Sequence, residues 1–204
     1  MKIKKKWLVS FLLGMILITS IAAAVIYAAT QKNDSVHNKL SVPTIKGEIV
    51  ETFTPNEPIA VGGTQTKDII IENTGSTGFL VRVMVFPEIE HPSIDDGRLP
   101  ASIGKEVLIT VGTNWQYGED GYYYYLGEVS ALGTTTSLFN NISLADNLGT
   151  EYNGADFAIQ VKSETVTAAN YQYRKAWFNL GLTETPQAEP LVTIDTALAT
   201  VVNS

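Results

Sequence analysis

Residues 68–86 have the sequence DIIIENTGSTGFLVRVMVF, and this stretch decides the fold class. Two β-branched and aromatic runs, 69–71 and 79–86, flank a polar turn sequence at 73–78, a pattern that predicts a β-hairpin. Side chains of a strand alternate between its two faces, so one face of the second run is wholly apolar and predicts a buried core. The residues on that face are Phe79, Val81, Val83 and Val85. The opposite face carries Arg82, whose partner the stretch does not identify.

A hairpin alone is marginally stable, so other segments must supply the strands that cover this apolar face. Several segments are alternating in polarity or rich in β-branched and aromatic residues, and turn residues separate them. The expected strands are 47–53, 105–111, 114–117, 121–129, a segment entered at Leu138 and Phe139, and 156–166. Because strands do not alternate with helices, the pattern predicts an all-β, two-sheet antiparallel β-sandwich. It does not separate jelly-roll from immunoglobulin-like topology.

One short helix is expected at 168–180, where Tyr173 and Trp177 recur at helical spacing. The tail, residues 183–204, starts with a Pro-rich linker. It ends in an apolar run at 191–202 that is compatible with an added strand or a helix. The β-sandwich domain is therefore expected to span residues 46–182.

The N-terminus has the pattern of an export signal. A basic start, MKIKKK, precedes a mostly apolar run at 7–29, which predicts a hydrophobic signal helix. Cleavage after Ala28 would remove residues 1–28; cleavage after Ala24 is the alternative. An uncleaved anchor is a further possibility, because the run is long enough to span a bilayer at roughly 20 residues. In each case the body is exported, and polar residues 29–45 predict a flexible N-terminal segment.

Charge and cysteine content exclude several classes of function. The whole chain carries a net charge of −7, and without residues 1–28 the remaining ten basic and 21 acidic residues give −11. A body this acidic repels nucleic acid and anionic membranes, so neither is an expected partner. The absence of Cys excludes disulfides, thiolate catalysis and Cys-based metal sites. No HExxH, GxSxG or phosphate-loop pattern is present, so the sequence predicts neither an enzyme nor a cofactor.

One acidic loop is the candidate metal site. The residues concerned are Glu88, Glu90, His91, Asp95 and Asp96. Carboxylate oxygens suit calcium and an imidazole suits zinc. The alternative is a solvated acidic loop, which is favoured because Pro87 and Pro92 bracket the cluster and its spacing repeats no known ligand loop.

An aromatic cluster is the second candidate site. Trp115 and Tyr117 precede four consecutive tyrosines, Tyr122 to Tyr125. Exposed, they would form a platform for a sugar or a peptide. The favoured alternative is structural: alternate tyrosines fill the core while their neighbours cover the outer face.

Three blocks carry a resemblance to a known family: DIIIENTGSTGFLVRVMV at 68–85, NWQYGEDGYYYYLGEVSALGTTTSLFNNISL at 114–144 and FAIQVKSETVTAANYQYRKAW at 157–177. With the basic, apolar leader ahead of them, these blocks resemble the TasA, BsaA and camelysin (CalY) family of exported biofilm-matrix proteins. The resemblance spans about residues 1–180 and rests on the order of the blocks.

The resemblance implies a jelly-roll β-sandwich, a leader cut by a SipW-type signal peptidase, and a place at the cell surface or in the extracellular matrix. In some members of that family an N-terminal strand completes the next subunit of a fibre. The corresponding donor here would be residues 39–45. Camelysin members have also been classed as metallopeptidases, whereas this chain has no recognisable zinc-protease motif.

The leading hypothesis is a secreted structural protein of the cell surface or biofilm matrix that self-associates, with fibre formation by N-terminal strand donation as one mode. The alternatives are a camelysin-like cell-surface metallopeptidase that uses His91 and the carboxylates of its loop, and a carbohydrate-binding adhesin that uses Trp115 and the tyrosine run. Membrane contact is expected only through residues 7–29 before cleavage.

Overall fold

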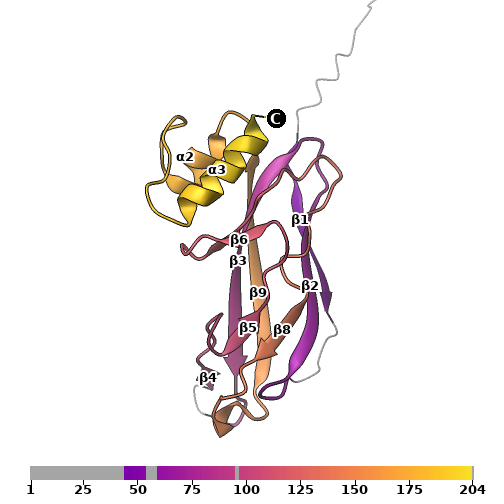
Figure 1. Ribbon diagram of the computed structural model, residues 1–204. Helices are drawn as coiled ribbons and strands as arrows, with labels where there is room; N and C mark the ends of the chain where they lie inside the picture. Colours follow the sequence, from indigo (N-terminus) through magenta and orange to yellow (C-terminus); the bar gives the residue numbers. More distant parts are fainter. Residues whose placement is uncertain (1–43, 54–58, 95–96, 204) are drawn as a thin grey trace, which may run out of the picture. The chain divides into compact units, whose positions relative to one another are not determined.

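The computed structural model describes residues 44–53, 59–94 and 97–203 (Figure 1). The export signal expected at 1–28, and residues 29–43 of the expected flexible segment, lie outside the described residues. In chain order the elements are β1 (Gly47–Phe53), β2 (Thr64–Asn73), β3 (Phe79–Glu90), β4 (Arg98–Leu99), β5 (Val107–Ile109), β6 (Trp115–Tyr117), β7 (Tyr122–Tyr125), β8 (Asn141–Leu144), the short 3-10 helix η1 (Thr150–Tyr152), β9 (Asp156–Thr167), α2 (Gln172–Phe178) and α3 (Leu191–Val202).

The described strands form two antiparallel sheets, as the sequence predicts. One sheet has the order β1-β2-β8-β5. In the other, β3 is central: β9 pairs with one of its edges, β7 and β4 pair with the other, and β6 pairs with β7. Strands β6 and β7 are the hairpin expected around the Asp-Gly turn, with Trp115 opposite Tyr125 and Tyr117 opposite Tyr123.

The hairpin predicted at 68–86 is wrong, because its two strands belong to different sheets. Strand β2 pairs with β1 and β8, whereas β3 pairs with β9, β7 and β4. Residues 74–76 bond to residues 44–46 ahead of β1, for example through the Thr74 N–H and the Lys46 carbonyl at 2.9 Å. The fully buried Asn73 amide donates to two backbone carbonyls where the chain crosses between the sheets. A turn sequence specifies that the chain changes direction, but it does not determine which strand the next segment pairs with.

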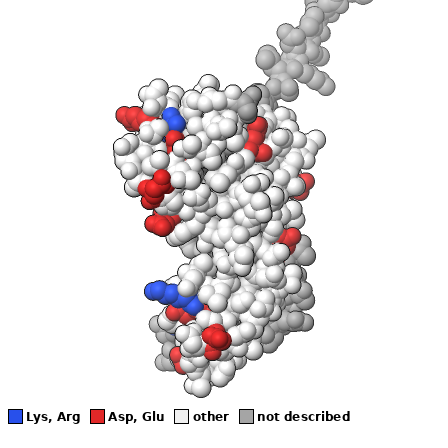
Figure 2. Space-filling view, viewed as in Figure 1, with Lys and Arg blue, Asp and Glu red and all other residues white. Residues whose placement is uncertain are grey.

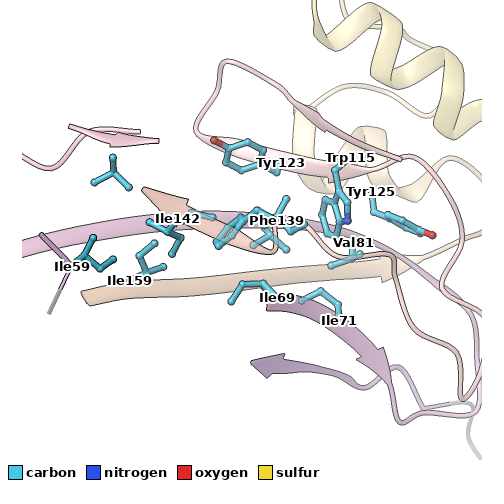
Figure 3. Close-up of a cluster of buried hydrophobic side chains, with 14 of the residues drawn as sticks. Ile59, Ile69, Ile71, Val81, Trp115, Tyr123, Tyr125, Phe139, Ile142 and Ile159 are labelled. Carbon is cyan, nitrogen blue, oxygen red and sulfur yellow. The ribbon is translucent and has the colours of Figure 1, made fainter. Parts of the chain in front are cut away.

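The apolar face of β3 lies in the main core, as predicted. Phe79, Val81 and Val83 are fully buried, and Val85 is 9% exposed. The same cluster contains Ile69, Ile71, Trp115, Tyr123, Tyr125, Ile142 and Ile159, which come from both sheets, and Phe139 from the segment before β8 (Figure 3). Burying one such large apolar side chain stabilises the fold by about 1.5–3 kcal/mol, so this cluster is a main source of stability.

The opposite face of β3 is covered at one end by the two helices. Leu80 of β3 and Tyr124 of β7 are fully buried against Tyr173 of α2 and against Ile194 and Leu198 of α3. The two α3 residues are four apart and therefore share one face of that helix.

The expectation of a single short helix is therefore incomplete. The helix expected at 168–180 is present as α2, and the apolar run at 191–202 forms a second helix, α3. Its β-branched residues weaken intrinsic helix propensity, but burial of one apolar face against the sheet outweighs that cost.

Three expected strands differ in extent. The strand expected at 105–111 is shortened to β5, the strand expected at 121–129 is shortened to β7, and the strand expected from Leu138 begins at Asn141. Leu138 and Phe139 are nevertheless buried, and their backbone groups bond to Ile69 of β2. Across the residues that the structure describes, no helix is long and apolar enough to cross a membrane.

Candidate functional site

Strand β9 forms an edge of the second sheet, and its free side is the candidate site for association. It is 12 residues long and pairs with β3 from Asp156 to Thr167, and with no other strand of the described chain. Phe157 and Val161 pack against the main core yet remain only partly buried, as expected where no further strand covers them. An unpaired edge of this length is a template for pairing with another chain.

The hydrogen-bonding groups of this edge can be assigned from the sheet geometry. Phe79 exchanges backbone hydrogen bonds of 3.1 and 2.8 Å with Val129, on the side of β3 away from β9. Backbone groups alternate between the two sides of an antiparallel strand, and the β3–β9 register has no break. The backbone N–H and C=O groups of odd-numbered β3 residues therefore point away from β9. The backbone groups of the odd-numbered β9 residues opposite them point to the free edge of the sheet. These β9 residues are Phe157, Ile159, Val161 and Ser163.

The far end of this edge is less open. Thr165 also directs its backbone outward, but its side chain lies against the start of β1, where a methyl group on Gly47 would come within 3.0 Å of Thr165 Cγ2. The free edge is therefore the segment 157–163. Strand β1 is also paired on one side only within the described chain, but it has seven residues against the 12 of β9.

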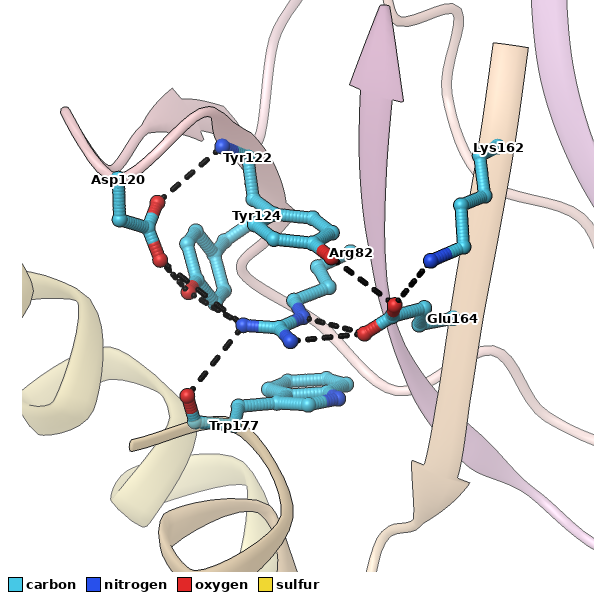
Figure 4. A network of polar contacts seen from close by, with 7 residues as sticks. All are labelled: Arg82, Asp120, Tyr122, Tyr124, Lys162, Glu164 and Trp177. Atoms are coloured by element: carbon cyan, nitrogen blue, oxygen red, sulfur yellow. Dashed lines mark hydrogen bonds and ion pairs between the residues drawn. The ribbon is translucent and has the colours of Figure 1, made fainter. Parts of the chain in front are cut away.

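Arg82 fixes β9 to the rest of the sheet (Figure 4). It lies directly opposite Glu164 of β9, and its Nε and Nη2 donate to Glu164 Oε2 at 2.9 and 2.7 Å. The guanidinium stacks on the Tyr122 ring, 3.7 Å from its centroid, and lies 5.5 Å from the centroid of the Trp177 ring. Nη1 donates to the Tyr124 hydroxyl at 3.2 Å. One side chain of β3 thus joins β9, β7 and α2.

The cluster around Arg82 is fully partnered. Glu164 Oε1 accepts from the Tyr122 hydroxyl at 2.9 Å and from Lys162 at 2.8 Å, and Asp120 accepts from Tyr124 at 2.6 Å. Among the described residues, no buried side-chain nitrogen or oxygen lacks a hydrogen-bond partner. The cluster thus has a structural role: it joins β3 to β7, β9 and α2.

The charges of the cluster shift the pKa values of its members. Burial alone would raise the pKa of Glu164, but hydrogen bonds from Lys162, Arg82 and Tyr122 outweigh it and lower the pKa to about 2. Burial and the hydrogen bond to Asp120 raise the pKa of the Tyr124 hydroxyl. Glu164 is therefore ionised at all pH values near neutrality.

The described side chains of the candidate metal loop do not converge on one point; each bonds to a different group. Glu88 accepts from Gln160 at 3.0 Å, and Glu90 lies 3.5 Å from Arg98. His91 Nδ1 accepts the Ser93 N–H at 3.1 Å, so its Nε2 carries the proton and donates to the Asn153 carbonyl at 3.1 Å. Asp95 and Asp96 lie outside the described residues. Within the part described, no three His, Asp or Glu side chains are placed to hold a metal ion.

The aromatic cluster divides between the two cores. Trp115, Tyr123 and Tyr125 belong to the main core, and the Trp115 Nε1–H donates to the Thr136 carbonyl at 2.9 Å. Tyr122 and Tyr124 belong to the cluster under the helices. Tyr117 is 43% exposed, and it packs on Tyr123 with ring centroids 4.9 Å apart. Alternate tyrosines thus fill the two cores, as the structural interpretation expects, and they form no open aromatic platform.

Comparison of the chain with protein families, with curated proteins and with solved structures found no match.

Glu164 is the member of the Arg82 cluster that the sequence did not reveal. It is 82 residues from Arg82, and only the pairing of β3 with β9 brings the two together. A signal was present: both residues lie on the non-core face of their strands, and an Arg–Glu pair is favourable across neighbouring strands.

Proposed function

We propose that the protein is a secreted structural component of the cell surface or biofilm matrix, and that it self-associates by adding a strand of one subunit to the β9 edge of the next. The export signal expected at 1–28 supports secretion, and the acidic composition suits a soluble subunit. The observation that carries the mechanism is the free edge at 157–163.

The donor in this mechanism is the segment before Thr44. Residues 39–45 are the donor that the family resemblance implies, but the last two of these contribute to their own domain. The Thr44 N–H donates to Ser76 Oγ at 3.1 Å, and the Ser76 N–H donates to the Thr44 carbonyl at 3.0 Å. Ile45 packs against the main core. The donor available to a neighbour is therefore within residues 31–43.

Strand addition would satisfy the outward backbone groups of β9. A donated strand opposite 157–163 would bond to the N–H and C=O groups of the four odd-numbered residues there. Each hydrogen bond contributes a net stabilisation of about 0.5–1.5 kcal/mol, and further burial of the partly buried Phe157 and Val161 side chains adds to it.

Replacing Ser163 with proline tests the mechanism. Proline lacks the N–H that would bond the donor, and it is tolerated at an edge where that N–H faces solvent. We expect Ser163→Pro to remain folded and to sediment as a monomer at concentrations where the exported chain and Ser163→Ala assemble. Removal of residues 31–43 is expected to have the same effect. Sedimentation velocity gives the result, with circular dichroism as the check on folding.

If folded Ser163→Pro assembles to the same extent as Ser163→Ala, the β9 edge is excluded as the site of strand addition. Assembly of the chain without residues 31–43 would exclude the donor. A chain that stays monomeric in every form would remove the proposed function itself.

A further inference from the structure

A second opening lies on the other side of β3, between β7 and β4. It is a groove of about 730 Å³, within the roughly 300–1,000 Å³ range of ligand sites. Four large apolar side chains that are 36–43% exposed line it: Phe86, Leu108, Val111 and Tyr117. The ring of Tyr123 and the 101–104 loop complete its walls.

The groove carries no charge. None of its lining residues is Asp, Glu, Lys or Arg, although the chain as a whole is acidic. Figure 2 shows the same contrast on one face of the molecule, where an uncharged band separates charged side chains toward each end. A groove of this composition favours an uncharged, apolar occupant.

The floor of the groove is an unpaired stretch of β3. On this side of the strand, Val83 pairs with Tyr123 of β7 and Ile89 pairs with Leu99 of β4. Val85, between them, directs its N–H and C=O to the same side, because it follows the alternation that Phe79 sets. No strand, backbone group or side chain of the described chain bonds to these two groups.

This unpaired stretch is unusual because Val85 is only 9% exposed. Val85 lines the groove, so its N–H and C=O, which bond to no other group of the described chain, are available to an extended segment that enters the groove. Pro87, the next residue that faces this side, has a carbonyl and no N–H. The stretch therefore offers one donor and two acceptors, in the order in which an extended peptide backbone would meet them.

We propose that this groove binds a short, extended, uncharged peptide segment of another protein. One residue of the segment exchanges two backbone hydrogen bonds with Val85, and the residue two positions along donates to the Pro87 carbonyl. A bulky aliphatic or aromatic side chain of the segment lies among Leu108, Val111 and Tyr117. The four residues from Val85 to Glu88 have no strand partner on this side, so they accommodate about three or four peptide residues at 3.3 Å each.

The charge-free lining favours a foreign segment over the chain's own N-terminal segment. Residues 31–39 include Lys32, Asp34 and Lys39, which a charge-free groove would not complement, and the uncharged residues 40–43 lead directly into Thr44, which is bonded to Ser76 of its own domain. The site is separate from the β9 edge, because it lies on the opposite side of β3.

The test uses the exported chain and a capped six-residue peptide of alternating leucine and threonine. We expect saturable binding by fluorescence polarisation and a shift of the Val85 amide resonance in NMR spectra. The variant Leu108→Glu should bind at least about tenfold more weakly, because its carboxylate must lose water when an apolar side chain covers it. The control is Leu132→Glu, which places the same charge at a leucine that is 80% exposed and outside the groove. A peptide with lysine in place of leucine should not bind.

Three outcomes would overturn the proposal. They are no binding of the leucine peptide at millimolar concentration, equal binding by Leu108→Glu and Leu132→Glu, and equal binding of the lysine peptide. Tighter binding of a peptide with the sequence of residues 31–43, with the same shift of Val85, would replace the foreign partner by a second copy of this chain. None of these results depends on self-association at β9, which Ser163→Pro tests separately.

Discussion

Replacing Asp195 with alanine is expected to lower the free energy of unfolding by about 3–5 kcal/mol, the cost of removing one partner of a buried ion pair. Arg174 of α2 donates from Nε and Nη2 to the two Asp195 oxygens of α3 at 2.7 and 2.8 Å. The two side chains are 9% and 4% exposed. Tyr173 also donates to Asp195, at 2.8 Å, so the substitution leaves a buried guanidinium and a buried hydroxyl without this acceptor.

Urea-induced unfolding at pH 7 measures this loss. Thr196→Ala is the matched control, because its side chain is exposed on the same helix, and it should change stability by at most about 0.5 kcal/mol. Combining Arg174→Met with Asp195→Leu should recover most of the loss, since well-packed apolar residues often replace a buried ion pair without cost. A loss below about 1 kcal/mol in Asp195→Ala would show that the pair does not hold α3 to α2.

Replacing Arg82 with methionine is expected to lower the free energy of unfolding by about 2–4 kcal/mol at pH 7. The arginine side chain is 10% exposed, and its removal takes two hydrogen bonds from Glu164 and the stacked cation from Tyr122. Arg82→Lys keeps the charge but loses the planar fork, so about half of the loss should remain. Urea-induced unfolding of the three proteins provides the comparison.

The loss in Arg82→Met should depend on pH. Since the folded-state pKa of Glu164 is lowered to about 2, its ionised form stabilises the fold above the unfolded-state value of about 4.5, and this contribution disappears as pH falls through about 2. The stability difference between wild type and variant should therefore narrow between pH 5 and pH 2. A difference that stays constant over that range would mean that Arg82 acts through packing and not through the Glu164 carboxylate.

Periodicity was sufficient for the parts of the fold that depend on local pattern. The alternation at 79–85 predicts which face of β3 enters the core, and the Asp-Gly turn predicts the β6–β7 hairpin. The tyrosine run also obeys alternation, because Tyr123 and Tyr125 enter one core and Tyr122 and Tyr124 the other.

Pairing between distant segments was not predictable from the same patterns. The segment 73–78 has the composition of a hairpin turn, yet it carries the chain from one sheet to the other. The run at 191–202 contains both β-branched residues and an i, i+4 apolar spacing, and the surface available on β3 and β7 selects the helix.

The candidate site shows the same limit. Sequence composition identified the acidic loop around His91 and the tyrosine run, because titratable and aromatic residues are conspicuous in a sequence. The free edge of β9 and the gap beside Val85 are properties of missing pairing, and no residue type marks them. They follow only from the sheet order and from the direction of the Phe79 hydrogen bonds.

Residue-resolved hydrogen exchange of β9, in monomeric and in assembled protein, tests self-association by strand addition most directly. In the monomer, the amides of Ile159, Val161 and Ser163 should exchange quickly, while those of Gln160 and Lys162, which bond to β3, exchange slowly. Assembly should slow the first three strongly and leave the other two slow. Exchange of the first three that is equally fast in the assembled protein would contradict strand addition at this edge.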